Sequence, residues 1–93
     1  MLSSSYKIPG GKLVKIKLWV DSGKVQSITI LGDFFLHPEE VIEVIENSLI
    51  GMKIEADILL TTVSNVLEKT KATFIGASAE DLVKAIMMAR NSQ

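Results

Sequence analysis

The 93-residue sequence contains no cysteine, which excludes disulfide bonds, thiolate nucleophiles and thiolate metal ligands. Aromatic residues are scarce, at 5% of the chain, so aliphatic side chains must fill any core. No apolar run reaches the about 18 residues that a membrane-spanning helix needs, and the N-terminal segment MLSSSYK has no long apolar stretch. The sequence therefore predicts an unprocessed soluble protein without membrane association, and the absence of cysteine is compatible with a cytoplasmic location.

The length of the chain suits one domain over residues 1–93 and is too short for a catalytic domain plus a substrate domain. Hydrophobic residues make up 47% of it. A folded chain of this size buries roughly 60–70% of the surface that its unfolded form exposes, so we expect a globular unit with its own core.

The net charge is only −1, but the charges are sorted along the sequence. Residues 1–32 hold five lysines and one aspartate, a balance of +4, whereas residues 33–57 hold seven acids and one lysine, a balance of −6. Nucleic-acid binding favours a basic balance overall. The sorting instead predicts oriented docking to a charged protein partner, and no nucleic-acid ligand.

The segment from Lys12 to Asp21 alternates with a period of two, the pattern of a strand with one buried face. The predicted buried face comprises Val14, Ile16, Leu18 and Val20. The turn residues DSGK then lead into a second strand from Val25 to about Gly32. Upstream, Pro9-Gly10-Gly11 would turn a third strand, over residues 4–8, into the first.

Helical periodicity begins with HPEEVIEVIENSLIG, where Pro38 suits the first helical position and Gly51 can close the helix in a left-handed conformation. Its acidic face, with Glu39, Glu43 and Glu46, should mostly face water. A second helix is predicted over residues 55–70, and Ser78 with Asp81 predicts the capped start of a third. Residues 71–76 between them read as a short extended piece.

This order of elements is typical of an α+β domain, with about three helices packed on one face of a small antiparallel sheet of about three strands.

The Gly-Gly-Lys of residues 10–12 could be a phosphate-binding loop, a hairpin turn or a docking surface. A nucleoside-triphosphate loop needs glycine, four residues, then glycine-lysine-serine or threonine, followed by a helix. Here Leu13 follows the lysine and a strand comes next, so the helix N-terminus that would hold a phosphate is missing. The spacing therefore favours a turn.

The segment GDFFLHPEE gathers Asp33, His37, Glu39 and Glu40, which could form a metal site or an acid–base pair. A single histidine without cysteine is a weak ligand set. The simpler interpretation is that Asp33 or His37 serves the start of the helix while Phe34 and Phe35 enter the core. We therefore expect no metal site and no catalytic residue in this chain.

Trp19 lies beside Lys15 and Lys17 on the strand face opposite the predicted core. Such a tryptophan could stack on a base, anchor a protein interface or be covered by the chain itself. The charge balance favours the last two interpretations.

Four motifs in this order resemble the C-terminal accessory domain of lipoate-protein ligases. They are the opening Lys-x-Pro-Gly-Gly-Lys, the strand end Gly-Asp-Phe-Phe, the helix end Leu-Ile-Gly, and TFIGASAEDLVKAI, located at residues 7–12, 32–35, 49–51 and 73–86. The resemblance covers the chain from about residue 7 to residue 90. Each motif alone is weak, but their order and spacing are specific.

The resemblance implies a function. In that family a large domain holds the adenylate-forming site, and this chain is similar to the split form, in which the accessory part is a separate subunit. The pair would activate lipoate with ATP to lipoyl-AMP and transfer the lipoyl group to a lysine of lipoyl-bearing acceptor domains. The resemblance places ATP, magnesium and lipoate in the catalytic subunit and implies that this chain alone binds none of them. It also implies a 1:1 heterodimer in which the small subunit serves chiefly the activation step.

We interpret the turn Pro9-Gly10-Gly11 as bringing Lys12, and secondarily Lys7, toward anionic groups at the subunit boundary, with glycine permitting close backbone approach. The remaining motif residues have a structural interpretation, at the strand-to-helix corner and the helix end: Gly32, Asp33, Phe34, Phe35 and Gly51.

Two other functions stay open. One is a free-standing protein- or ligand-binding α+β module that presents Trp19 and has no role with lipoate. The other is an RNA-binding domain, whose binding would weaken steeply with salt. The acidic segment from Asp33 to Asp57 argues against RNA.

Overall fold

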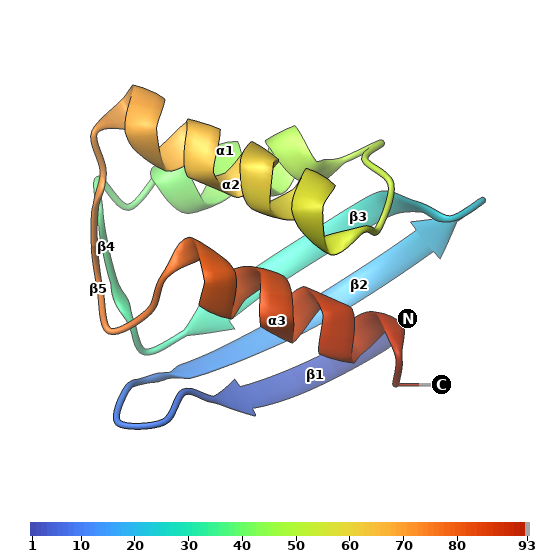
Figure 1. The fold of residues 1–93 in the computed structure, drawn as a ribbon, viewed down its shortest axis with the longest axis horizontal. Helices are drawn as coiled ribbons and strands as arrows, with labels where there is room; N and C mark the ends of the chain where they lie inside the picture. The colour runs from blue at the N-terminus through green and yellow to red at the C-terminus, as the bar shows by residue number, and fades with distance from the viewer. Residues whose placement is uncertain (93) are drawn as a thin grey trace.

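A computed structural model describes residues 1–92 (Figure 1). Within them the chain forms five strands and three helices, so the predicted α+β class is confirmed. In chain order the elements are β1 (Leu2–Lys7), β2 (Leu13–Asp21), β3 (Lys24–Gly32), β4 (Phe35–His37), α1 (Val41–Leu49), α2 (Ala56–Thr70), β5 (Thr73–Ile75) and α3 (Ala79–Arg90).

The main sheet is antiparallel with the order β1-β2-β3, and its register places Ser4, Ile16 and Ile30 side by side. The two predicted hairpins are thus confirmed. A register shift between Trp19 and Val20 interrupts the alternation, however. As a result Val20 is 38% exposed instead of buried, and the buried face of β2 ends at Leu18.

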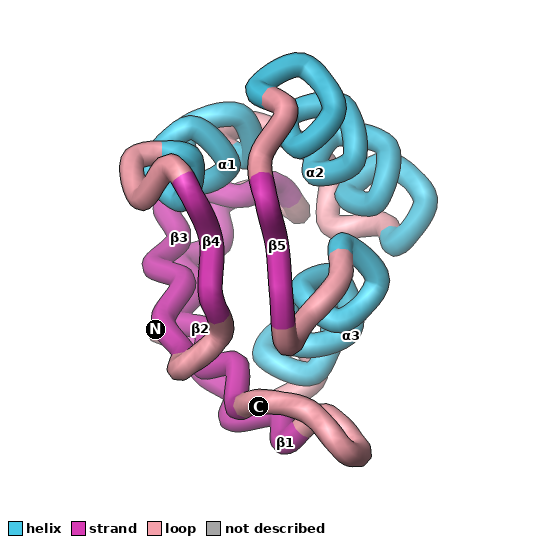
Figure 2. Tube along the Cα trace, turned by 90° about the vertical axis from the view of Figure 1, so that its left-hand side faces the viewer, coloured by secondary structure: helices cyan, strands magenta, loops and turns pink. Residues whose placement is uncertain are grey.

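A second, two-stranded sheet joins β4 to β5 at one end of the molecule (Figures 1 and 2). The predicted extended piece at residues 71–76 corresponds to β5, but its partner β4 was not predicted. Leu36 takes the inner face of β4 and is buried. Because successive side chains of a strand point to opposite faces, Phe35 and His37 point outward, and Phe35 is 53% exposed. The expectation that Phe35 enters the core is therefore wrong, whereas Phe34 packs against the core edge.

The three helices cover one face of the main sheet, as predicted (Figure 2). Helix α3 packs on β1 and β2, α1 packs on β3, and α2 packs on both other helices. Small side chains in α3 allow close approach, and the Ser4 hydroxyl donates to the Ala85 carbonyl at 2.6 Å. The largest fully buried side chains come from both layers: Ile16, Leu18, Ile45, Leu49, Leu59, Leu82 and Ile86.

Helix α1 starts later than predicted. Backbone N–H groups of Val41 and Ile42 donate to the carbonyls of Pro38 and Glu39, so residues 38–40 form a tight turn and Pro38 is not the first helical residue. The N-cap is Glu40, without a side-chain hydrogen bond. Neither Asp33 nor His37 serves the helix start, which corrects that expectation.

The other helix ends follow the sequence more closely. Ser78 and Asp81 form the predicted capping box, with both reciprocal hydrogen bonds present. Gly51 has φ +85°, the conformation expected of it, and its N–H donates to the Val25 carbonyl at 2.8 Å. Glu46, however, is half-buried and its carboxylate accepts from the Ile30 N–H at 2.7 Å, so it ties α1 to β3 instead of facing water.

No helix within residues 1–92 is both long enough and apolar enough to cross a membrane.

Candidate functional site

The Pro-Gly-Gly-Lys segment forms the exposed turn between β1 and β2. Ile8 anchors it in the core, while the Ile8 N–H donates to the Lys12 carbonyl at 3.0 Å and the Gly11 N–H donates to the Ile8 carbonyl at 2.9 Å. Gly10 has φ +69°, which favours glycine. A strand follows the turn, so the geometry lacks the helix N-terminus of a phosphate loop, in agreement with the spacing argument.

Two distant segments hold this turn from either side. The Lys12 N–H donates to the Gly76 carbonyl at 3.3 Å, and the Leu13 N–H donates to Oδ1 of Asp33 at 2.7 Å. The Asp33 N–H in turn donates to the Leu13 carbonyl at 3.3 Å. The residues that follow β3 and β5 therefore fix the backbone at Lys12 and Leu13.

Three glycines allow these segments to approach so closely. A Cβ on Gly11 would lie 2.8 Å from Cγ2 of Ile8, and one on Gly76 would lie 2.6 Å from Cγ of Lys12. A Cβ on Gly32 would lie 2.4 Å from the Leu13 carbonyl oxygen. Glycine is most strictly required at position 32, because a backbone atom can move aside less easily than the side-chain atoms nearest to Gly11 and Gly76.

The two lysines of the motif differ in their surroundings. The Lys7 ammonium donates to the Gly11 carbonyl and so braces the turn. Lys12 is exposed, and the carbon stem of its side chain lies over Gly76. A stem supported in this way loses less rotamer freedom on binding, so Lys12 is the better placed of the two to meet an anion.

Asp33 adds a negative charge beneath these lysines. The pKa of its carboxyl lies below the ordinary aspartate value, chiefly because the Leu13 N–H donates to it. Some loss of solvation raises the pKa, whereas the backbone N–H of Asp33 and the charges of Lys12 and Lys7 lower it further. The carboxylate is therefore the stable form, and it holds the start of β2 instead of capping a helix.

We expect an Asp33→Asn variant to unfold at a lower temperature than the parent chain at neutral pH, because the amide accepts a weaker hydrogen bond and lacks the charge. A carboxyl with a lowered folded-state pKa stabilises the fold above its unfolded pKa of about 3.9 and loses this effect as the pH falls through the folded value. The gap in Tm should therefore close at acidic pH. Thermal unfolding of both chains from neutral to acidic pH checks this prediction, and a difference in Tm that stays constant with pH would contradict it.

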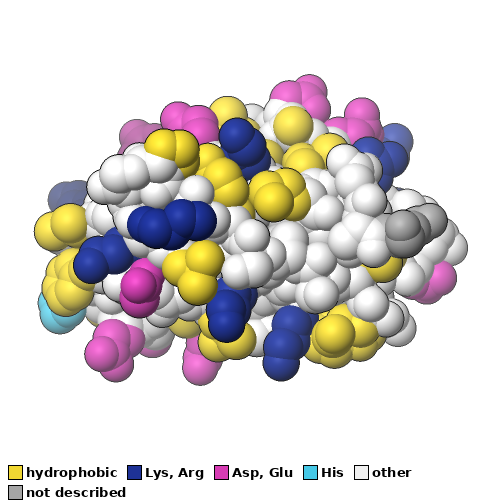
Figure 3. Space-filling model, turned by 90° about the horizontal axis from the view of Figure 1, so that it is seen from below, with side chains coloured by type: hydrophobic (Ala, Val, Ile, Leu, Met, Phe, Trp, Pro, Cys, Tyr) yellow, Lys and Arg dark blue, Asp and Glu magenta, His cyan; other side chains and the backbone are white. Residues whose placement is uncertain are grey.

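Not every predicted residue lies at this turn. Trp19 is half-buried near the far end of β2, and Gly51 contacts the start of β3 at that same far end. On the outer face of the sheet, Lys15 and Lys17 are exposed, and Figure 3 shows basic side chains interspersed with hydrophobic ones on this side of the domain. The structure therefore separates Trp19 from the lysine turn.

Gly76 is the functional candidate that the sequence reasoning missed. Its position at the end of TFIG was visible, but only the fold brings it against Lys12. In the described part of the chain, no three carboxylate or imidazole side chains converge on a common point that could hold a metal ion. His37 instead stacks on Phe35, with 6.2 Å between ring centroids.

Fold and site together define a small α+β domain that presents one braced, lysine-bearing turn. Residues 1–86 match the family model described as bacterial lipoate protein ligase C-terminus, and the chain belongs to this family. The resemblance seen in the sequence motifs is thereby confirmed.

Two individual matches agree with the family. The chain is 38% identical to lipoate-protein ligase A subunit 2 of Thermoplasma acidophilum over 55 residues, which are 59% of this chain and 57% of that protein. The chain thus spans little more than half the length of this curated relative. It also superposes with a TM-score of 0.80 and 26% identity on a chain from the structure of a bipartite lipoate protein ligase and its E2 lipoyl domain from the same organism, covering 92% of this chain and 94% of that one.

Proposed function

We propose that this chain is the accessory subunit of a two-component lipoate-protein ligase. With a separate catalytic subunit it serves the ATP-dependent activation of lipoate to lipoyl-AMP, before the lipoyl group passes to a lysine of a lipoyl-bearing protein. The observation that carries the proposal is the likeness over 92% of the chain to a component of a bipartite ligase structure. A relative from the same organism, named as a second ligase subunit, agrees with it.

In this proposal the chain contributes no reacting group. ATP, magnesium and lipoate bind in the catalytic subunit, and the accessory subunit, in a 1:1 complex, covers that site. Covering the site excludes water from a hydrolysable mixed anhydride and holds the reactants in position. The exposed Lys12 on its braced turn is the group best placed to offset the negative charge of a phosphate there.

Pyrophosphate release from ATP and lipoate tests the proposal with three samples: this chain alone, the catalytic subunit alone, and the two mixed. We expect activity only in the mixture. Full activity in the catalytic subunit alone would remove the activation role and leave a free-standing binding module as the better account. A supply of preformed lipoyl-AMP serves as the control, because transfer from it should proceed without this chain.

A further inference from the structure

The β4–β5 sheet carries an exposed apolar pair. Phe35 and Ile75 are direct cross-strand partners, so their side chains project from the same face. They are 53% and 60% exposed, so both side chains present apolar surface to solvent. In Figure 2 the two strands lie side by side toward the viewer, with no helix in front of them. We call this pair the apolar ridge.

A cavity lies beside the ridge. It has a volume of about 300 Å³ and lies between the end of β3, β4 and the start of α1, with Leu31, Phe34 and Ile42 among its lining residues. Leu31 is itself 47% exposed. Interfaces place their strongest contacts where a bulky side chain fills such a pocket next to apolar surface. The ridge and the cavity together form a surface suited to another protein.

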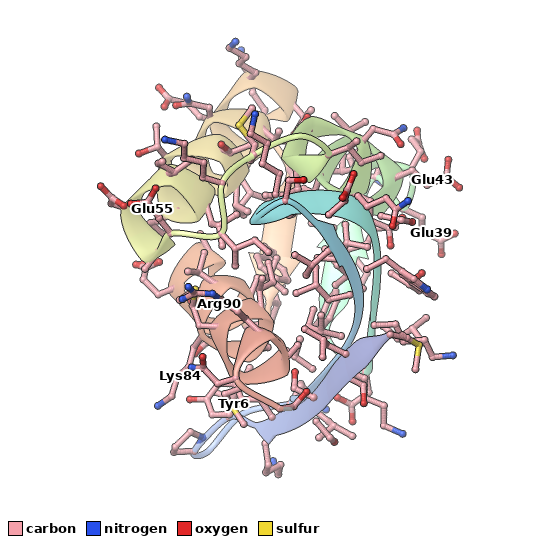
Figure 4. All side chains as sticks on the ribbon, turned by 90° about the vertical axis from the view of Figure 1, so that its right-hand side faces the viewer. Tyr6, Glu39, Glu43, Glu55, Lys84 and Arg90 are labelled. Carbon is pink, nitrogen blue, oxygen red and sulfur yellow. The ribbon has the colours of Figure 1, made fainter. Side chains whose placement is uncertain are left out.

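Opposite charges flank this surface. On the β5 side, the side chain of Lys12 lies over Gly76, the residue directly after Ile75. On the α1 side, Glu39 lines the cavity, and Figure 4 shows Glu39 and Glu43 projecting from the same side of the molecule. Lys12 on one side of an apolar centre and acidic side chains on the other favour one orientation of a bound partner.

We propose that the catalytic subunit of the ligase docks on this surface, so that its apolar contact lies on the ridge and its anionic site lies at the Lys12 turn. This inference rests on the proposed function and adds the contact surface. The occupant follows from the likeness of this chain to parts of a two-component ligase. The surface would fit an apolar patch bordered by an anionic group on one side and basic residues on the other. Because the ridge adjoins Lys12, docking there brings that lysine to the subunit boundary without rearrangement of the domain.

The double variant Phe35→Thr/Ile75→Thr tests the ridge, since threonine keeps a preference for strands while removing the apolar surface. The matched control is Val44→Thr/Ile50→Thr, two exposed apolar residues outside the ridge. Isothermal titration calorimetry measures the Kd of each chain for the catalytic subunit. We expect the ridge variant to bind at least about 30-fold more weakly and the control to bind like the parent chain.

Three results would contradict the proposed docking surface. They are an unchanged Kd for the ridge variant, an equal loss in the control pair, or a dimer of the parent chain in sedimentation that the ridge variant dissociates. An unchanged Kd together with lipoyl-AMP formation by the parent mixture removes the surface and leaves the proposed function standing. A parent chain that neither binds nor activates the catalytic subunit removes both.

A charge variant keeps the test decisive if the ridge variant loses its folded circular-dichroism signal. Glu39→Lys/Glu43→Lys alters only exposed side chains on the acidic flank. It should slow association with the catalytic subunit by about 10-fold at low salt, with a smaller effect at high salt. Association at the parent rate contradicts the assigned orientation.

Discussion

A Gly32→Ala variant is expected to lose about 2–3 kcal/mol of unfolding free energy, because an added methyl group overpacks a site that cannot move freely. The new Cβ would lie 2.4 Å from the Leu13 carbonyl oxygen and 2.5 Å from the Phe34 ring. Relief requires separating β2 from the end of β3, which is where Asp33 and Leu13 exchange hydrogen bonds. Thermal unfolding should show a Tm lower by about 10–20 °C.

Gly10→Asn is the matched control within the same turn. Gly10 has φ +69° and no atom within 4 Å of an added Cβ, and asparagine tolerates this conformation better than other side chains. Its cost should stay below about 1 kcal/mol. Equal Tm values for the parent chain and Gly32→Ala would mean that the β2–β3 contact at Leu13 is not tight in solution.

Features that depend on neighbours in the chain were predictable. The alternation of Val14, Ile16 and Leu18 places them in the core, and Ser78 with Asp81 forms the expected capping box. In each case the periodicity or the spacing of three residues determines the geometry directly. The order of the longer helices and strands, and hence the α+β class, follows from such local patterns.

Features that depend on contacts between distant segments were not predictable from the sequence. Phe35 resembles a core residue in the sequence, but the pairing of β4 with β5 turns it outward. Glu46 resembles a solvated helix residue, but its carboxylate accepts a hydrogen bond from the Ile30 N–H of β3. A strand of three residues is too short to show a recognisable periodic pattern, and its partner strand is known only from the folded structure.

The candidate site divides in the same way. The turn itself, with Gly10 in a left-handed conformation, follows from Pro-Gly-Gly. The hydrogen bonds that fix the turn to Asp33 and Gly76 could not be predicted from the sequence, because they join the ends of three different strands. The sequence therefore predicted that both lysines lie at the turn, while the structure distinguishes Lys7, which braces the turn, from Lys12, whose side chain is exposed.

A Lys12→Ala variant is expected to reduce the rate of lipoyl-AMP formation by the two-subunit complex about 100-fold, the effect typical of removing one positioned electrostatic group from a water-excluded site. The turn itself should survive, because its hydrogen bonds at Lys12 come from the backbone. Single-turnover formation of lipoyl-AMP measures the effect. Transfer from preformed lipoyl-AMP should be unchanged, since in the proposed mechanism the catalytic subunit performs that step.

Two further variants separate charge from position. Lys12→Arg keeps the positive charge and a long stem over Gly76, so it should retain most of the activation rate. Lys15→Ala removes an exposed lysine from the neighbouring strand and should have little effect, because that side chain is not held by the turn. If Lys15→Ala slows activation as much as Lys12→Ala does, the lysines act through the general positive field of the domain, and the braced turn has no special role.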